Sequence, residues 1–486
     1  MKSRVWGGDT LSGLEVTMAK FSAPTLLIFK EFLNKDLIKM ALAKTLDVLP
    51  VLAARLEFSK DNILQLSKTL SGALLVTYDV TTVKGAPCIE DFFDKASLFE
   101  KTLFFQQGFV SEHLRFGMSY LMHSPLLCLQ LSYFDTGECF LGINISHAVS
   151  DARTLAIFMK TLNYFCSNPN QIPSLPELIF HRNRFPKPIT LPEKEFWVKY
   201  GMLPFQLDEA TYFPFLKLMS NILRSFLFNY GVKIRIDVNK FAKFKEKVNQ
   251  TFQEPRVDWV TSNDLLFCMI FSLLKPKEKY FSVFTNCRGR SRYLPSDNYV
   301  GHGVASIAIK MDFTQKNRNL GDLALEYRRK FQLRLKNDDA SYSLDFLDIV
   351  KNKCLTHFPA MGTGELAEFN VNSWTAFQDD MYSCTFGGQS HPVRIPLCYP
   401  PSRYIQIQPE YRDPNTGQID WTVNVVLSKE ETLQVCKGIQ EHGWNEFMTV
   451  TTDYFHLFQL EKQRNLKRRI RFLSSIFISL SLFSIL

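Results

Sequence analysis

The sequence predicts an α/β protein built in two halves, and two observations support this prediction. A strand-like alternation of side chains changes to a helical period just after His147, so that sheet and helix follow one another along the chain. A proline-rich stretch from about residue 168 to 204 then precedes a second half in which strand and helix patterns again alternate. With 486 residues and 46% hydrophobic side chains, the chain is long enough for two or three domains with large cores.

In the first half, a helix is expected at residues 36–46, where apolar side chains return at helical spacing before Pro50. Two strands are expected at 126–134 and 139–147, and the turn-forming residues between them predict a β-hairpin. A helix follows, and its apolar face is formed by Leu155, Phe158, Met159, Leu162 and Phe165.

The second half shows the same alternation after the proline-rich connection. Strands are expected at 232–238, 280–285, 303–311 and 421–427. Helices are expected at 262–274, 320–336 and 428–438. We therefore expect an N-terminal domain at residues 1–170, a crossover connection at 171–215, a C-terminal domain at 216–460 and a basic, then apolar tail at 461–486.

The charge of the chain argues against a nucleic-acid partner. The formal net charge is +9, but six cations crowd into residues 462–471 and leave the body only mildly basic. No recognition motif for DNA or RNA accompanies this charge. The mild excess suits anionic small molecules such as phosphorylated cofactors.

The cysteines and the two termini bear on localisation. Ten cysteines without CxxC pairs indicate reduced thiols, and residues 1–20 lack the apolar run of a signal peptide, so we expect a cytoplasmic protein. The terminal stretch 472–486 is apolar or serine throughout, but its 15 residues fall short of the roughly 20 that span a bilayer. Membrane contact through this tail and a frayed end without a partner both remain open.

His147 is the first candidate for chemistry. Strand alternation places it on the same face as Leu141, Ile143 and Ile145, so its imidazole is expected to point inward. A histidine at the end of such a face can meet a tunnel while partly desolvated, and desolvation keeps it a neutral base near pH 7. The alternative is a core histidine satisfied by a backbone carbonyl.

Asp151 lies four residues further on, at the start of the expected helix. One interpretation is a helix cap whose carboxylate complements the helix dipole. The other is a pairing with an arginine that fixes the loop carrying His147, which makes Asp151 an orienting residue. Arg290 and Arg292 are the candidate partners, and the alternative for them is a solvated charge cluster beside a strand.

The segment His147-Ala148-Val149-Ser150-Asp151 resembles the HxxxD motif of the CoA-dependent acyltransferase superfamily, and in particular of the BAHD acyltransferases. Further segments resemble the family's pattern in the expected order over nearly the whole chain. They are the opening segment at 11–15, a helix start at 260–265, an arginine-containing segment at 288–292, a tyrosine and glycine turn at 299–302, the pair Ser373-Trp374, and a last motif at 385–389.

This resemblance implies two similar domains of the chloramphenicol acetyltransferase type, each a mixed sheet covered by helices, with the active site in a channel at their interface. It implies transfer of an acyl group from acyl-CoA to a hydroxyl or amine of a small molecule, without a covalent acyl-enzyme. His147 would be the general base and Asp151 the orienting residue. No metal and no bound cofactor are expected, and the family favours a monomer in secondary metabolism.

The resemblance also gives roles to residues far from His147. The oxyanion that develops during transfer needs a preorganised donor, for which the Ser373 hydroxyl or the Trp374 indole is the candidate. Arg290 and Arg292 are expected to give structural support, together with Phe386 and Gly387 of the last motif. His302 and His391 are isolated in sequence, so we expect both to be structural.

The chain departs from the family's usual pattern at several positions. Ala152 stands where glycine is usual, and His302 stands where asparagine is usual. The last motif keeps only Phe386-Gly387, because the usual aspartate, tryptophan and second glycine are missing at 385, 388 and 389. That motif is regarded as structural in the family, where its aspartate pairs with an arginine, so its change leaves the base in place.

Two alternative functions remain open at this point. One is a condensation-type or wax-ester-type acyltransferase with carrier-bound or long-chain lipid substrates. Such enzymes usually carry two adjacent histidines, whereas Ser146 precedes His147 here. The other is a non-catalytic descendant that only binds a hydrophobic small molecule or a protein.

Overall fold

The computed structural model describes residues 10–79, 124–171, 230–252, 258–337, 369–396 and 404–454, apart from 20–21, 62, 68–70, 135, 276–279, 292–293, 295 and 314–317, and adds 178, 180, 212–214 and 357–359. Most of the expected crossover connection and the whole expected tail lie outside these residues. Within the part of the chain so described, no helix combines the length and the apolar character needed to cross a membrane.

The N-terminal half contains a four-stranded sheet in the order β1-β6-β5-β4. Its strands are β1 (Ser22–Phe29), β4 (Leu74–Asp79), β5 (Leu127–Tyr133) and β6 (Cys139–Ser146). The sheet is mixed, since β4 runs parallel to β5 and the other pairs are antiparallel. The predicted hairpin is confirmed as β5 and β6. All eight residues of β6 are buried because this strand is central in the sheet.

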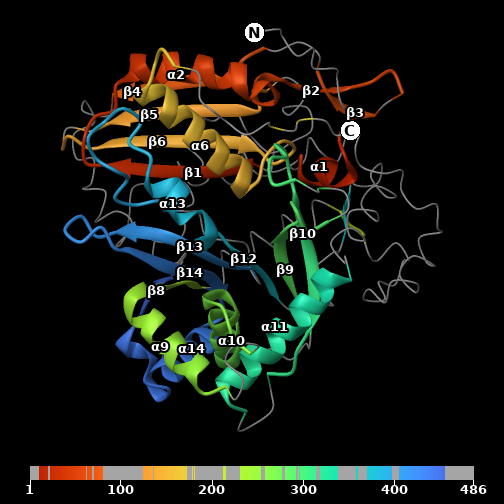
Figure 1. Cartoon of the computed structure of the whole chain (residues 1–486), viewed down its shortest axis with the longest axis vertical. Helices are drawn as coiled ribbons and strands as arrows, with labels where there is room; N and C mark the ends of the chain where they lie inside the picture. The colour runs from red at the N-terminus through yellow and green to blue at the C-terminus, as the bar shows by residue number, and fades with distance from the viewer. Residues whose placement is uncertain are drawn as a thin grey trace, which may run out of the picture.

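Two long helices pack against each other over one face of this sheet (Figure 1). The helix α2 (Lys35–Val48) begins at Asn34, whose side chain accepts from the backbone N–H groups of the first turn. The helix α6 (Ala152–Ser167) follows the end of β6 after a five-residue loop. Smaller elements complete this half, namely α1 (Gly13–Met18), η1 (Pro50–Ala53), β2 (Leu56–Phe58) and β3 (Leu64–Leu66).

The C-terminal half contains a seven-stranded sheet in the order β10-β9-β12-β13-β14-β8-β15. Its strands are β8 (Tyr230–Ile236), β9 (Tyr280–Asn286), β10 (Val304–Lys310), β12 (Phe369–Ser373), β13 (Tyr404–Arg412), β14 (Ile419–Leu427) and β15 (Met448–Tyr454). This sheet is also mixed, because β12 runs parallel to both of its neighbours. All four strands predicted for this half are confirmed, as β8, β9, β10 and β14.

Four helices cover the face of the larger sheet that points away from the N-terminal half (Figure 1). They are α9 (Val238–Gln250), α10 (Ser262–Leu274), α11 (Leu320–Lys336) and α14 (Lys429–Glu441). The predictions of α10, α11 and α14 are confirmed, and α9 was not predicted. The remaining elements are β7 (Tyr212–Pro214) paired with β11 (His357–Pro359), and η4 (Thr375–Phe377), α13 (Gln378–Tyr382) and η5 (Trp444–Glu446).

The two sheets are joined through the backbone of residues 393–395. The N–H of Ile28 in β1 donates to the Arg394 carbonyl at 3.0 Å, and the N–H of Ile395 donates to the Glu410 carbonyl of β13 at 2.9 Å. Just before this joint, α13 packs on α6 (Figure 1). The segment 378–395, which the sequence places in the C-terminal domain, therefore contacts the N-terminal half.

Candidate active site

The loop from β6 to α6 carries His147 and Asp151, and its own side chains fix its shape. The Ser150 hydroxyl donates to the Ser146 carbonyl at 3.0 Å, and the Ala148 N–H donates to the Ser146 hydroxyl at 3.3 Å. Asp151 caps α6, because its Oδ1 accepts from the Thr154 N–H at 3.0 Å. All residues of the loop except His147 are buried, which leaves His147 as its partly exposed side chain.

One hydrogen bond fixes the tautomer of neutral His147. Its Nδ1 lies 2.9 Å from the Ser150 carbonyl oxygen, and a carbonyl can only accept. Nδ1 therefore carries a hydrogen, and in the neutral ring Nε2 keeps its lone pair. Burial and the neighbouring His302 lower the pKa of His147 to about 4, against smaller opposing contributions from Ser150 and Asp151. His147 is thus a neutral base at physiological pH.

Asp151 forms a buried ion pair with Arg288, which lies two residues after the end of β9 in the other half of the chain. The contact is bidentate, with Nη1 2.6 Å from Oδ2 and Nη2 3.1 Å from Oδ1. Arg288 has none of its side chain exposed and Asp151 has 2%. Burial alone would raise the pKa of Asp151, but Arg288 and the hydrogen bonds it receives lower it to about 2.

The turn before β10 closes over this ion pair and completes the joint between the halves. Gly303 donates its N–H to Asp151 Oδ2 at 2.8 Å, and the Thr154 hydroxyl donates to the Gly301 carbonyl at 2.8 Å. Arg288 Nη2 also donates to that carbonyl at 2.7 Å. A Cβ on Gly303 would lie 2.7 Å from Arg288 Nη1, so this position needs glycine for close approach.

The prediction that Arg290 pairs with Asp151 was wrong, because the arginine that pairs with Asp151 lies two residues earlier. Arg288 forms the pair, whereas Arg290 is exposed and Arg292 lies outside the described residues. The physical reason is the turn after β9, where Gly289 has a φ of +66°. Arg288 still lies against the joint at the strand end, and the turn carries Arg290 out to solvent.

Both interpretations of Asp151, the helix cap and the partner of an arginine, are correct at the same time. It caps α6 through Thr154 and it pairs with an arginine. Within the described part of the chain, its hydrogen bonds go to Arg288, Gly303 and Thr154, and none goes to His147. This arrangement suits a residue that orients the loop.

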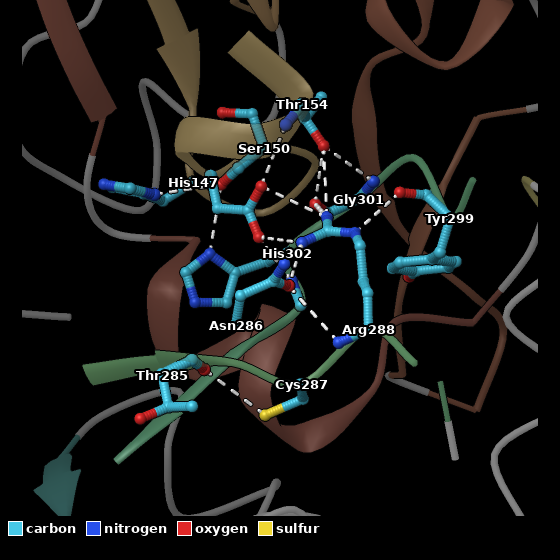
Figure 2. Close-up of polar contacts among 12 residues, drawn as sticks. His147, Ser150, Thr154, Thr285, Asn286, Cys287, Arg288, Tyr299, Gly301 and His302 are labelled. Atoms are coloured by element: carbon cyan, nitrogen blue, oxygen red, sulfur yellow. Dashed lines mark hydrogen bonds and ion pairs between the residues drawn. The ribbon is translucent and has the colours of Figure 1, made fainter. Parts of the chain in front are cut away.

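His302 lies beside His147, which sequence spacing did not reveal. The ring centroids are 5.4 Å apart and the rings are nearly perpendicular. His302 Nδ1 lies 3.0 Å from the same Ser150 carbonyl that His147 contacts (Figure 2). His302 is isolated in the sequence but lies next to His147 in the fold, and its one signal in the sequence was that it stands where asparagine is usual.

Ser373 and Trp374 lie at the end of β12. The Ser373 hydroxyl donates to Asn263 Oδ1 at 3.0 Å and lies 3.0 Å from the Thr375 hydroxyl. Trp374 is partly buried against the core. No hydrogen bond within the described residues links either side chain to His147.

Phe386 and Gly387 support the fold at a second joint, away from His147. The Phe386 ring is fully buried and meets Phe29 of β1 edge to face, with centroids 6.0 Å apart. Gly387 has a φ of +81°, and a Cβ there would lie 2.4 Å from a Leu37 methyl. The N–H groups of Thr385 and Phe386 both donate to Asn163 Oδ1 of α6, at 2.9 and 2.7 Å.

A family model described as the Transferase family matches residues 10–442 and so spans nearly all the elements described above. The chain belongs to this family. Its members are the BAHD-type acyltransferases, so the resemblance seen in the sequence is confirmed.

Known proteins resemble the chain in sequence and in structure. Phenolic glucoside malonyltransferase 1 of Bemisia tabaci is 26% identical over 200 residues, which are 39% of this chain and 42% of that protein. TRI101 of F. graminearum, solved with coenzyme A and T-2 mycotoxin, has a TM-score of 0.67 at 12% identity over 92% of this chain and 100% of that one. Vinorine synthase has a TM-score of 0.57 at 15% identity, over 89% and 92%.

At these identities, the likeness to the solved structures concerns the fold. It confirms the predicted architecture of two chloramphenicol acetyltransferase-like domains with mixed sheets. The sequence relative is matched over less than half of its own length, so its name says little about the substrates of this family member.

Proposed function

We propose that this family member transfers an acyl group from acyl-CoA to a hydroxyl or amine of a small molecule, with His147 as the general base. The observation that carries the proposal is the hydrogen bond from His147 Nδ1 to the Ser150 carbonyl. It leaves Nε2 as an acceptor on the one partly exposed side chain of the loop. Membership of the BAHD-type acyltransferases supports the class of reaction.

The chemistry is direct transfer. His147 Nε2 takes the proton of the acceptor hydroxyl while its oxygen attacks the thioester carbonyl carbon. The carbon–sulfur bond breaks, and the thiolate of CoA receives the proton from Nε2. The hydrogen bond to Ser150 becomes charge-assisted while the imidazole is protonated, which stabilises the imidazolium in its buried setting.

Asp151 does not act as a proton acceptor in this mechanism. Its carboxylate is paired with the Arg288 guanidinium and accepts hydrogen bonds from the N–H groups of Gly303 and Thr154. Its contribution is geometric, because it fixes the backbone from which Ser150 holds the base. The two halves must therefore be joined for His147 to be aligned.

Trp374 is the better candidate for the donor to the oxyanion. The single hydrogen of the Ser373 hydroxyl is directed at Asn263, whereas the indole N–H of Trp374 has no hydrogen bond to a described residue. We expect Trp374→Phe to lower kcat by about 10²-fold, which is the size expected for loss of one such donor. Ser373→Ala is the comparison, and a larger loss there would assign the role to Ser373.

The proposed reaction uses acyl-CoA as a co-substrate and needs no cofactor bound to the protein. The protein would act as a cytoplasmic monomer, for which size-exclusion chromatography and cell fractionation are the tests. Because a malonyltransferase for phenolic glucosides is among the sequence relatives, malonyl-CoA and phenolic glucosides belong in the first substrate panel.

The test is release of free thiol by the purified protein with acyl-CoA donors from acetyl and malonyl to long-chain and aromatic. Pooled alcohols and amines serve as acceptors, and donor without acceptor is the control for hydrolysis. Acceptor-dependent thiol release is the expected result. Absence of release with every pairing would contradict the proposal and favour a carrier-bound donor or a binding protein.

A further inference from the structure

The imidazoles of His147 and His302 share one carbonyl across the joint between the two halves. His147 directly follows β6, and His302 belongs to the turn before β10. Their Nδ1 atoms lie 2.9 and 3.0 Å from the Ser150 carbonyl oxygen (Figure 2). A carbonyl oxygen has two lone pairs, so it can accept from both rings at once.

This geometry fixes the hydrogen on both rings. Each Nδ1 must donate to Ser150, so both imidazoles adopt the same tautomer. His302 is 4% exposed, whereas His147 is partly exposed. A substrate therefore meets His147, and His302 acts on the reaction through His147 alone.

Resting on the proposed role of His147 as the base, we propose that His302 is a positioning residue that holds the His147 ring through Ser150 and keeps His147 unprotonated in acid. Two imidazoles this close cannot both carry a proton without strong repulsion. A proton that enters the pair in acid goes to His302 and disfavours a second proton on His147. His147 then keeps its free Nε2 to a lower pH.

Asp151 and two backbone carbonyls favour a proton on His302, whereas burial and Arg288 oppose it. Among the described residues, the charged groups that face the pair are Asp151 at the start of α6 and Arg288 after β9. Burial lowers the pKa of His302, Asp151 and the Ser150 and Val304 carbonyls raise it, and Arg288 lowers it. Another carboxylate near this joint, Glu15 of α1, accepts from the Tyr299 hydroxyl at 2.9 Å.

The matched variant is His302→Asn. An asparagine keeps an N–H donor for the Ser150 carbonyl but cannot take up a proton. His302→Gln keeps the same donor on a longer side chain and is the second variant. His442→Asn is the control, since His442 is an exposed histidine stacked on Trp444. The melting temperature of each variant verifies folding.

The first experiment is an NMR titration of histidine-labelled protein without substrate. The signal of His147 among the nine histidines is assigned by its loss in His147→Gln. In His302→Asn we expect the proton affinity of His147 to rise by about tenfold or more, because a competing, repelling charge is gone. An unchanged titration midpoint would overturn the proposal.

The second experiment compares the pH dependence of kcat/KM in the wild type and in His302→Asn. The ratio of wild-type to variant activity should rise by about twofold as the pH falls from about 8 to about 5, because a tenfold higher proton affinity moves the midpoint of His147 from about 4 to about 5. A ratio that is constant with pH would show a purely structural role and overturn the proposal. Equal turnover by wild type and His147→Ala would instead refute the proposed function, and the NMR midpoint would still decide the coupling of the rings.

Discussion

Two of the joints between the halves of this molecule use different chemistry. At the first joint, a buried carboxylate and a buried guanidinium meet behind the loop that carries His147. At the second joint, the neutral amide of Asn163 accepts from the backbone of residues 385–386, beside the buried ring of Phe386. In the family's usual pattern, the second joint also carries an aspartate that pairs with an arginine.

The difference indicates at which joint a neutral group can take the place of a charged pair. A neutral amide can replace a charged pair where the task is to hold backbone, because the same N–H groups remain satisfied. The first joint must also set the direction of an imidazole, and its bidentate geometry fixes both distance and angle. A buried ion pair thus aligns the base at the first joint, and a neutral amide holds the backbone of residues 385–386 at the second, where Asp380 of α13 also pairs with Lys160 and Arg153 of α6 near the surface.

The largest expected effect is at the first joint. Arg288→Met leaves the Asp151 carboxylate buried without its partner, which should cost about 3–5 kcal/mol of the free energy of unfolding and abolish turnover. Urea unfolding and acyl transfer measure the two effects. Arg290→Met is the matched control on the same turn, because Arg290 is exposed and should change stability by about 0.5 kcal/mol or less. Equal costs for the two variants would contradict the comparison.

A smaller effect is expected at the second joint. Asn163→Ala removes the acceptor of the Thr385 and Phe386 N–H groups, which should cost about 1–3 kcal/mol of unfolding free energy. Turnover of the folded protein should be nearly unchanged because His147 is held by the other joint. Asn163→Asp keeps the acceptor oxygen and is the control. Loss of turnover in a folded Asn163→Ala protein would show that the second joint also aligns the base.

The pH dependence of folding stability should also distinguish the two joints, because the first joint holds a histidine and a carboxylate whose pKa values are lowered. The folded-state pKa of His147 lies at about 4, so the unfolded chain binds a proton at His147 as the pH falls through about 6.5 while the folded chain does not. Folding stability should therefore fall between pH 6.5 and about 4. The stabilisation from Asp151 is lost only below its ordinary pKa of 3.8, towards about 2, and does not confuse this window.

Urea unfolding between about pH 7 and pH 5 measures this slope. It should be shallower in His147→Gln and unchanged in Asn163→Ala, since Asn163 carries no titrating group. A His147→Gln protein with the wild-type slope would show that His147 is not held neutral in the folded state.

Local pattern was enough to predict the strand before His147, a cap at Asp151 and the helix that follows, because strand alternation, a cap and helical spacing all lie within one short segment. The role of His147 as the base came from the resemblance of residues 147–151 to the HxxxD motif. It could not choose among neighbouring arginines, because the choice depends on a positive φ at Gly289 and on the missing Cβ of Gly303, far along the chain. The strand β13 escaped prediction because Pro409 and a register shift interrupt its alternation.

The contact of His302 with Ser150 could not be predicted from the sequence. The two residues are 152 positions apart and meet only when the halves close. No period or spacing reports such a contact, and a departure from the family's usual residue marks the position without giving its role. The partnership of Asn163 with the last motif escaped for the same reason, since it joins residues 222 positions apart.

The central claim, that His147 is the base for acyl transfer, is tested most directly by acceptor-dependent thiol release in His147→Ala. His442→Ala serves as the control because His442 is exposed and outside the joint. We expect His147→Ala to fold and to turn over about 10²-fold or more slowly, while the control keeps the wild-type rate. Wild-type turnover by a folded His147→Ala protein would contradict the account.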